Sequence, residues 1–259
     1  MGRGFRAVTV AAMRRRPASA LRRRPATAFW RRPLALAGTL ALAVALTGCS
    51  GNEPAAKEQT PTEQLAAAQA AFDSAKTVQL DLTSRNVPPR QNGVTRAKGA
   101  GVIDPTTPKF QGTITGTIKG IGGTIDVIAI GEDTYLKFFT PDYTKTDFDT
   151  LNAPNPAMFF NPTTGISALL PQTTDPKDDG QTRAGTEVLD KISGTLPGST
   201  IEQLFHLGDG TGTYAVSYGI TDTDQLRTAT LTGPFFPGSQ STYVLTLTDY
   251  GTPVEITSP

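Results

Sequence analysis

Residues that commonly bind metals or carry out nucleophilic catalysis are scarce in this sequence. It has one cysteine, Cys49, and one histidine, His206, in 259 residues. A single cysteine excludes an intramolecular disulfide framework and a thiolate metal cluster, and a single histidine makes a zinc site implausible. The G-x-S-x-G pattern of a nucleophile elbow is missing as well. We therefore expect no enzyme activity, no metal and no cofactor, and we interpret His206 as a structural residue near the end of a short helix.

Acidic residues are missing from the first part of the chain. Residues 1–48 contain ten arginines and no lysine, aspartate or glutamate. Residues 49–259 contain the other 14 basic residues and all 23 acidic residues, which gives a formal charge of −9. Because a single globular domain rarely sorts its charges in this way, the sequence predicts a basic leader followed by an acidic body. The body contains no basic run, which argues against nucleic-acid binding.

The basic leader ends in an apolar run that is typical of a signal peptide. Residues 33–46 are uncharged, too short for a comfortable membrane span and of the right length for the apolar part of a secretory signal. The run ends in Leu46-Thr47-Gly48-Cys49, which resembles a bacterial lipobox, where the cysteine sulfur receives a diacylglyceryl group before cleavage. We therefore predict a signal peptide at residues 1–48 and lipidation of Cys49. Acylation by two or more chains holds a protein stably at a membrane, so we expect the mature protein on the outer face of the plasma membrane.

Three alternatives stay open for this leader. An ordinary secretory signal with a chance cysteine is the alternative to a lipobox. Trp30-Arg31-Arg32-Pro33-Leu34 resembles a twin-arginine export signal, but we favour ordinary Sec export with an arginine-rich leader. Translation starts either at Met1 or at Met13.

The body begins with a tether and a helix. Residues 49–60 comprise the acylated cysteine and a short polar stretch, interpreted as a flexible tether. Thr60-Pro61-Thr62-Glu63 then predicts a capping box with proline at the first helical position. Leu65, Ala68 and Phe72 follow at helical spacing, which predicts an amphipathic helix to about Lys76.

From Val78 onward the apolar period changes to two, which predicts strands. Short helices are expected at 157–160, 166–170 and from a second capping box at Ser199–Glu202 through Phe205. An acidic loop is expected at 175–179, and a final hairpin turn at 249–251. Many short strands with few helices favour an α+β fold with a large antiparallel sheet in a single domain, residues 61–259. The predicted strands are residues 78–83, 95–103, 110–118, 124–130, 135–139, 186–196, 213–221, 225–231, 242–248 and 254–256.

Glycines recur on the apolar face of the strand that begins at Phe110. Gly112 and Gly116 alternate in phase with Ile114 and Ile118. Glycine on an inward face often marks curvature or the close approach of another group. Small residues there also leave room for a ligand, because a binding cavity must be concave and roomy. The alternative is that these isoleucines pack in an ordinary closed core.

Four features of the body carry a family resemblance. They are an alanine-rich helix after the lipobox, residues 124–130 followed by Tyr135-Leu136, the stretch Phe160-Asn161-Pro162-Thr163-Thr164-Gly165-Ile166, and residues 245–251 followed by Val254-Glu255-Ile256. With these features the chain resembles the LppX/LprA/LprF/LprG lipoproteins of actinobacteria from about residue 62 to 259, with a pattern nearest to that of LprG. It departs from the family pattern at Tyr250, where tryptophan is expected, and at Gly116, where a larger residue is expected.

The resemblance implies a curved antiparallel sheet, a half-barrel, with a few helices across its concave face enclosing an apolar cavity. It also implies that the protein carries acyl chains of membrane lipids or glycolipids from the plasma membrane toward the outer envelope, with a membrane transporter as a further partner. The alternatives are a structural or signalling envelope lipoprotein with a closed core, or a surface hydrolase. The candidate cavity residues are Leu80, Leu82, Gly112, Ile114, Gly116, Ile118, Ile128, Ile130, Met158, Phe159, Ile166, Leu169, Leu170 and Leu204.

Overall fold

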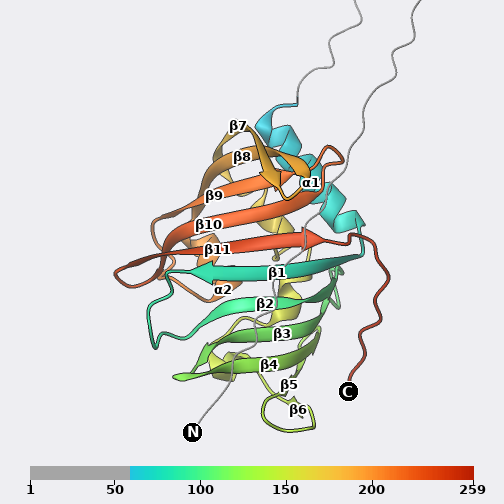
Figure 1. The fold of residues 1–259 in the computed structure, drawn as a ribbon, viewed down its shortest axis with the longest axis vertical. Coiled ribbons are helices and arrows are strands. Elements are labelled where there is room, and N and C mark those ends of the chain that lie inside the picture. Colours follow the sequence, from blue (N-terminus) through green and yellow to red (C-terminus); the bar gives the residue numbers. More distant parts are fainter. Residues whose placement is uncertain (1–58) are drawn as a thin grey trace, which may run out of the picture. The chain divides into compact units, whose positions relative to one another are not determined.

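The computed structural model describes residues 59–259. The predicted signal peptide and Cys49 lie outside the described residues. Eleven strands form one sheet in the order β6-β5-β4-β3-β2-β1-β11-β10-β9-β8-β7, and every neighbouring pair is antiparallel (Figure 1). The strands are β1 (Thr77–Arg85), β2 (Gly93–Val102), β3 (Lys109–Ile118), β4 (Ile121–Ile130), β5 (Asp133–Lys137), β6 (Thr144–Lys145), β7 (Thr174–Ala184), β8 (Glu187–Pro197), β9 (Thr213–Ile220), β10 (Leu226–Phe236) and β11 (Ser239–Thr248).

The chain builds this sheet as two meanders that meet in its middle. It starts at β1 in the centre and runs outward to β6 at one edge, then crosses to β7 at the other edge and returns to β11 beside β1. The crossing segment contains the 3-10 helices η1 (Asp149–Leu151), η2 (Pro156–Phe160) and η3 (Ser167–Leu169). Because the crossing joins opposite edges, it passes over one face of the sheet, and η2 contacts β2, β3 and β4 there.

The two α-helices cover the rest of that same inner face. Helix α1 (Pro61–Ser74) contacts β7, β10 and η3, and α2 (Gly198–Phe205) contacts β8 and β9. The predicted capping box of α1 is confirmed, since the Glu63 N–H donates to Thr60 Oγ1 (3.3 Å) and the Thr60 N–H donates to Glu63 Oε2 (2.8 Å). Leu65, Ala68 and Phe72 are its buried residues, as the helical spacing predicts.

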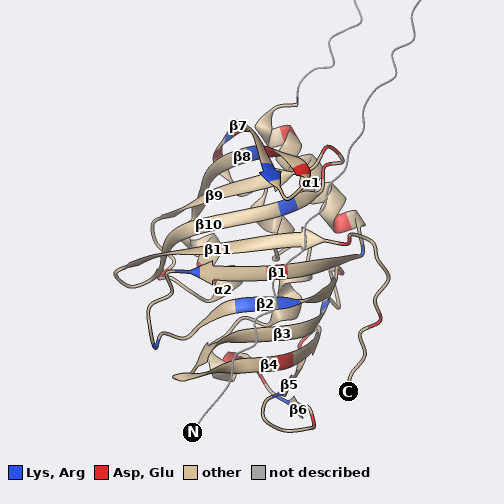
Figure 2. Ribbon diagram, viewed as in Figure 1, with Lys and Arg blue, Asp and Glu red and all other residues tan. Residues whose placement is uncertain are grey.

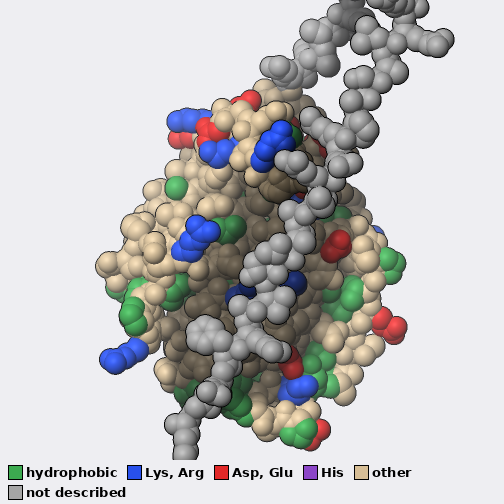
Figure 3. Space-filling view, in the orientation of Figure 1, with side chains coloured by type: hydrophobic (Ala, Val, Ile, Leu, Met, Phe, Trp, Pro, Cys, Tyr) green, Lys and Arg blue, Asp and Glu red, His purple; other side chains and the backbone are tan. Residues whose placement is uncertain are grey.

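The opposite, outward face of the sheet is largely polar. Threonine hydroxyls pair across neighbouring strands, as in Thr115 with Thr124 (2.8 Å) and Thr232 with Thr242 (3.0 Å). Charged residues are scattered along the strands (Figure 2). On this face Arg96 of β2 forms an ion pair with Asp81 of β1 (2.6 Å). The space-filling view shows the same scatter on this face (Figure 3). The alternation of polar and apolar residues along the strands therefore separates a solvated face from a buried one.

Side chains larger than glycine would not fit at several positions of β2 and β3. Gly99 and Gly112 are partners in the register of these strands. A Cβ on Gly112 would meet the Lys98 carbonyl oxygen and would lie 2.7 Å from the Gly99 Cα atom. A Cβ on Gly116 would likewise meet the Gly93 carbonyl oxygen. Of the two interpretations of these glycines, close approach of another group is the one observed, and the other group is the backbone of the neighbouring strand.

Four local predictions are wrong: the acidic loop, the second capping box, the last strand and the hairpin turn before it. The expected acidic loop at 175–179 lies in β7, because an edge strand needs hydrogen bonds on one side only and two register shifts absorb its irregular residues. The capping box expected at Ser199–Glu202 does not form, since α2 already begins at Gly198 with Pro197 as its N-cap.

The predicted last strand is also absent from the described residues, where β11 ends at Thr248 and the sheet has no strand after it. The final segment instead packs near the starts of β1 and β3. The Thr77 hydroxyl donates to the Thr252 carbonyl (2.8 Å), and the Lys109 ammonium donates to the Ile256 carbonyl (3.1 Å). The turn at 249–251 thus redirects the chain without forming a hairpin.

Candidate lipid-binding pocket

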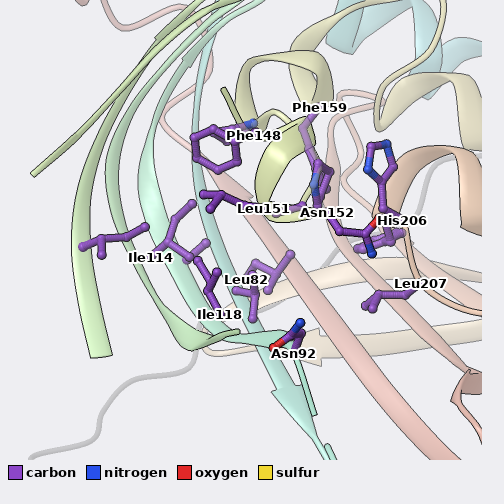
Figure 4. Close-up of a pocket in the computed structure, with 18 of the residues that line it drawn as sticks. Leu82, Asn92, Ile114, Ile118, Phe148, Leu151, Asn152, Phe159, His206 and Leu207 are labelled. Carbon is purple, nitrogen blue, oxygen red and sulfur yellow. The ribbon is translucent and has the colours of Figure 1, made fainter. Parts of the chain in front are cut away.

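An apolar pocket lies between the inner face of β1–β4 and the segments that cover it. Its volume is about 120 Å³. The sheet supplies Leu82, Ile114 and Ile118, and the crossing segment supplies Phe148, Leu151 and Phe159 (Figure 4). The strands curve around these side chains in the close-up, so the sheet forms one wall and the crossing segment forms the other.

A second pocket of about 250 Å³ adjoins the first. It extends toward the β3–β4 turn and Phe138, and both pockets are lined by Gly93, Val94, Ile114, Ile118, Ile125 and Leu151. Each volume is below the roughly 300 Å³ at which small-molecule sites usually begin. What the structure contains is thus a pair of adjoining apolar pockets, and the single large enclosed cavity that the resemblance implies is not shown.

Both pockets reach solvent at one end of the sheet. Their exposed lining residues are Asn92 in the β1–β2 loop, Lys119 and Ile121 in the β3–β4 hairpin, Asn152 after η1 and His206 after α2. The antiparallel register brings the β1–β2 loop and the β3–β4 turn to the same end, since Gly93 pairs with Thr117. We call this end of the sheet, defined by these five residues, the mouth. Deeper residues such as Leu80 are almost completely buried.

A wall of aromatic rings closes one side of the first pocket. The Phe159 and Phe205 rings meet edge to face with centroids 5.4 Å apart, and Tyr243 packs beside Phe205 at 5.5 Å. Such pairs fix ring positions as well as burying apolar area. Asn155 holds Phe159 in place, because its side chain caps η2 at the Ala157 N–H (3.0 Å) and donates to the Gly131 carbonyl (2.8 Å).

The pocket walls carry no carboxylate among the described lining residues. Lys119 and His206 are the ionisable side chains at the mouth, and burial raises the pKa of the Tyr243 hydroxyl, which keeps it neutral. Within residues 59–259 there is no group of three or more acidic, histidine or cysteine side chains placed to hold a metal ion. Such walls favour apolar ligands and provide no acid–base pair for chemistry.

Six of the fourteen candidate cavity residues line these pockets. Five of them, on β1, β3 and η2, line the first pocket, and Gly116 lines the second together with two of those five. The first-pocket residues are Leu80, Leu82, Ile114, Ile118 and Phe159.

The other eight candidates lie outside the pocket walls. Ile128 and Ile130 are on the outward face, because Ile114 pairs with Ile125 and alternate residues of β4 point to opposite faces. Gly112 lies against the β2 backbone. Met158 is half-buried on η2, and the remaining four are buried in the core: Ile166, Leu169, Leu170 and Leu204.

Sequence reasoning missed much of the wall that faces the sheet. Phe148, Leu151 and Asn152 come from a stretch rich in proline, asparagine and aspartate, where no periodicity marks an inward face. Tyr243 was predictable as an inward residue from the alternation with Leu245 and Leu247. His206 has the structural role expected, as the left-handed C-cap of α2, and its side chain also reaches the mouth (Figure 4).

The profile of the LppX_LprAFG lipoprotein family matches residues 60–256. The chain belongs to this family. The family resemblance expected from the motifs is thus confirmed, and the match spans every strand and helix described above. A comparison with curated proteins finds no match.

Two solved structures of family members share the fold. LprF from Mycobacterium bovis is 17% identical with a TM-score of 0.66, over 77% of this chain and 96% of the LprF chain. LppX from Mycobacterium tuberculosis is 18% identical with a TM-score of 0.57, over 76% of this chain and 98% of the LppX chain. At these identities the likeness establishes the large, open antiparallel sheet of the family and nothing finer. No helix between residues 59 and 259 has the length and apolar character needed to cross a membrane.

Proposed function

We propose that this protein is an exported, lipid-anchored carrier that binds acyl chains of lipids or glycolipids in the two adjoining pockets. The observation that carries the proposal is the apolar wall of these pockets, which opens to solvent at the mouth. Removing apolar surface from water contributes roughly 25 cal/mol per Å². Two pockets that share six residues offer such surface to a long, flexible chain better than to a compact ligand.

Anchoring at Cys49 would keep the carrier beside its source of cargo. The body carries a formal charge of −9, so it gains little from anionic lipid head groups, and the acyl anchor would supply membrane attachment. In this proposal the protein takes lipid from the plasma membrane and carries it toward the outer envelope. A membrane transporter is a further partner.

Two exposed apolar side chains support a membrane-facing mouth. Ile121, in the β3–β4 hairpin, is 62% exposed, and Phe139, just after β5, is 89% exposed. Phe138 beside it lines the second pocket and packs against Phe139, with ring centroids 4.0 Å apart and ring planes tilted by 45°. Large apolar side chains exposed beside an apolar pocket are suited to enter the outer layer of a bilayer while a lipid transfers.

The test is lipid extraction and mass spectrometry of the non-acylated Cys49→Ser protein purified from its native host. We expect about one lipid per protein. Ile114→Trp should abolish this lipid, because the indole fills the space where both pockets meet. The matched control is Thr113→Trp, which adds the same ring to the exposed, outward face of the same strand.

The outcomes separate the proposal from its alternatives. An indole that displaces about three methylene groups would weaken binding about 50-fold, at about 0.8 kcal/mol per methylene. Absence of lipid from the Cys49→Ser protein without a tryptophan substitution would support a structural or signalling protein with a closed core. Turnover of lipid esters would support a hydrolase. Equal lipid content in both tryptophan variants would exclude this pocket as the site.

A further inference from the structure

One buried hydroxyl group in the first pocket has no hydrogen-bond partner in the protein. Among residues 59–259, three buried side-chain polar atoms lack a partner: Asp81 Oδ1, Ser84 Oγ and Tyr243 Oη. The other oxygen of Asp81 is paired with Arg96. Of the three residues, only Tyr243 lines a pocket. A buried, unpaired hydroxyl costs free energy, so its retention calls for a physical explanation.

The hydroxyls of two other buried tyrosines, Tyr214 and Tyr218, and of the half-buried Tyr250 all have partners within the protein. The Tyr214 hydroxyl donates to the Pro234 carbonyl (3.1 Å) and the Tyr250 hydroxyl donates to the Leu226 carbonyl (2.5 Å). The Tyr218 hydroxyl bonds to the Thr173 hydroxyl (2.9 Å). Tyr243 is equally buried, at 1% exposure, yet its hydroxyl has none of these partners. The exception therefore coincides with the pocket.

The position of the Tyr243 hydroxyl is well defined. Tyr243 lies on β11, paired with Ser84 of β1, on the same inward face as Leu245. Its ring is held against Phe205 and Phe235, with the Phe235 centroid 4.6 Å away. A Cβ on Gly93 would lie 3.6 Å from Tyr243 Oη. The hydroxyl thus lies beside a residue that lines both pockets and directly follows Asn92 at the mouth.

From this geometry, and resting on the proposed function, we propose that the Tyr243 hydroxyl donates a hydrogen bond to the carbonyl oxygen of an ester-linked acyl chain. A carbonyl oxygen only accepts, and a neutral phenol supplies the donor. In a lipid ester the carbonyl joins the polar head region to the apolar chain. A buried donor just inside the mouth, with apolar walls beyond it, therefore sets how deeply the chain enters.

This contact selects for acyl esters over alkyl ethers of the same shape. An ether-linked lipid has no carbonyl oxygen, so its binding leaves the buried hydroxyl unpaired. Sites built around a hydrogen bond discriminate against ligands that lack the partner group. We expect the ester to bind about five-fold more tightly than the ether, the effect of one net hydrogen bond.

The experiment compares two lipids and three proteins. The lipids are phosphatidylcholines with two eight-carbon chains, joined to glycerol either by esters or by ethers, because short chains allow titration without a bilayer. The proteins are the Cys49→Ser chain and the same chain with Tyr243→Phe or Tyr218→Phe. Dissociation constants are measured by calorimetry. Tyr243→Phe should abolish the ester preference by weakening ester binding about five-fold, with ether binding unchanged.

Tyr218→Phe is the matched control, since it removes a buried hydroxyl that bonds within the protein. It should lower stability and leave the ester preference intact. Tyr243→Phe should keep or raise the melting temperature, because it removes an unpaired polar atom. Infrared spectra of an ester lipid labelled with ¹³C at the carbonyl provide a second measurement. The carbonyl stretching frequency should be lower in complexes with the parent and Tyr218→Phe proteins than in the complex with Tyr243→Phe, where the hydrogen bond is missing.

Each outcome bears on a different statement. Equal binding of ester and ether by the parent protein, together with an unshifted carbonyl stretch, would overturn the role of Tyr243 and leave the carrier proposal standing. Failure of the parent protein to bind either lipid would overturn the carrier proposal itself. An ester preference that survives Tyr243→Phe would assign the selectivity to another group and would also overturn the inference.

Discussion

Substituting Gly112 by alanine tests whether the glycines of β3 are needed for the packing of the strands or for leaving space to a bound ligand. The new Cβ would meet the Lys98 carbonyl oxygen and would lie 2.7 Å from the Gly99 Cα atom and 2.8 Å from Phe110 Cζ. Ordinary contacts of a Cβ atom begin at about 3.4 Å, so the Gly99 and Phe110 atoms would have to move by roughly 0.6–0.7 Å, and the Lys98 carbonyl oxygen, which is nearer, by more. Phe110 has little freedom to move, because its buried ring stacks on Phe160.

The cost of this crowding follows from overpacking in other cores. Backbone shifts forced by an added carbon cost about 1–3 kcal/mol, and we expect about 2–3 kcal/mol because two of the three close contacts are backbone atoms. For a domain of this size, 1 kcal/mol corresponds to about 2–4 °C in melting temperature. Gly112→Ala should thus lower the melting temperature by about 5–10 °C.

Gly122 provides the matched control on the next strand. A Cβ added to Gly122 would lie 3.8 Å from its nearest neighbours. Replacing a glycine by alanine where the backbone geometry allows it stabilises a protein by about 0.4–1 kcal/mol. Thermal and urea unfolding, followed by circular dichroism, would measure the stability of the two variants. An unchanged m-value would show that the change lies in stability and not in the unfolded state. If Gly112→Ala were as stable as Gly122→Ala but contained less lipid, the glycine would be making room for ligand and our account of the sheet would be refuted.

The remaining predictions concern the membrane. Cys49→Ser should move the protein from the membrane fraction to the soluble fraction of the cell envelope, because a single acylated residue supplies the proposed anchor; retention in the membrane fraction would contradict lipidation at Cys49. Phe139→Trp should show blue-shifted fluorescence with phosphatidylcholine vesicles. Trp30 is the only tryptophan of the chain and belongs to the predicted signal peptide, so the signal of the mature protein is unambiguous. Val188→Trp, at a 42% exposed position on β8 near the opposite edge of the sheet, should show no shift; equal shifts at both positions would exclude a membrane-facing mouth.

Local sequence signals predicted the elements well where neighbours in sequence decide the outcome. The Thr60–Glu63 capping box and the start of α1 depend on residues three positions apart, and both are confirmed. The alternation from Val78 to Thr83 predicted β1, and the strands predicted at 124–130 and 135–139 correspond to the paired strands β4 and β5. In each case the interactions that form the element lie within a few residues of one another.

The same signals were insufficient for the pocket. Alternation separates two faces of a strand but does not say which face the rest of the chain covers. Ile114 and Ile128 are equally apolar, yet the β3–β4 register places them on opposite faces of the sheet. Seven of the 22 residues that line the first pocket come from the irregular segment between Phe148 and Phe159, whose position depends on the crossing from β6 to β7.

By itself, the sequence determined a basic leader, an acidic body with a capped helix and many strands, and the motifs of the LppX_LprAFG lipoprotein family. These follow from composition and short-range patterns, and the match over residues 60–256 confirms the family. Only the tertiary structure decided that β11 joins β1 in the middle of the sheet, that the crossing segment covers the inner face, and that the Tyr243 hydroxyl stays unpaired in an apolar pocket. Those features arise from contacts between residues far apart in the chain, which local patterns do not encode.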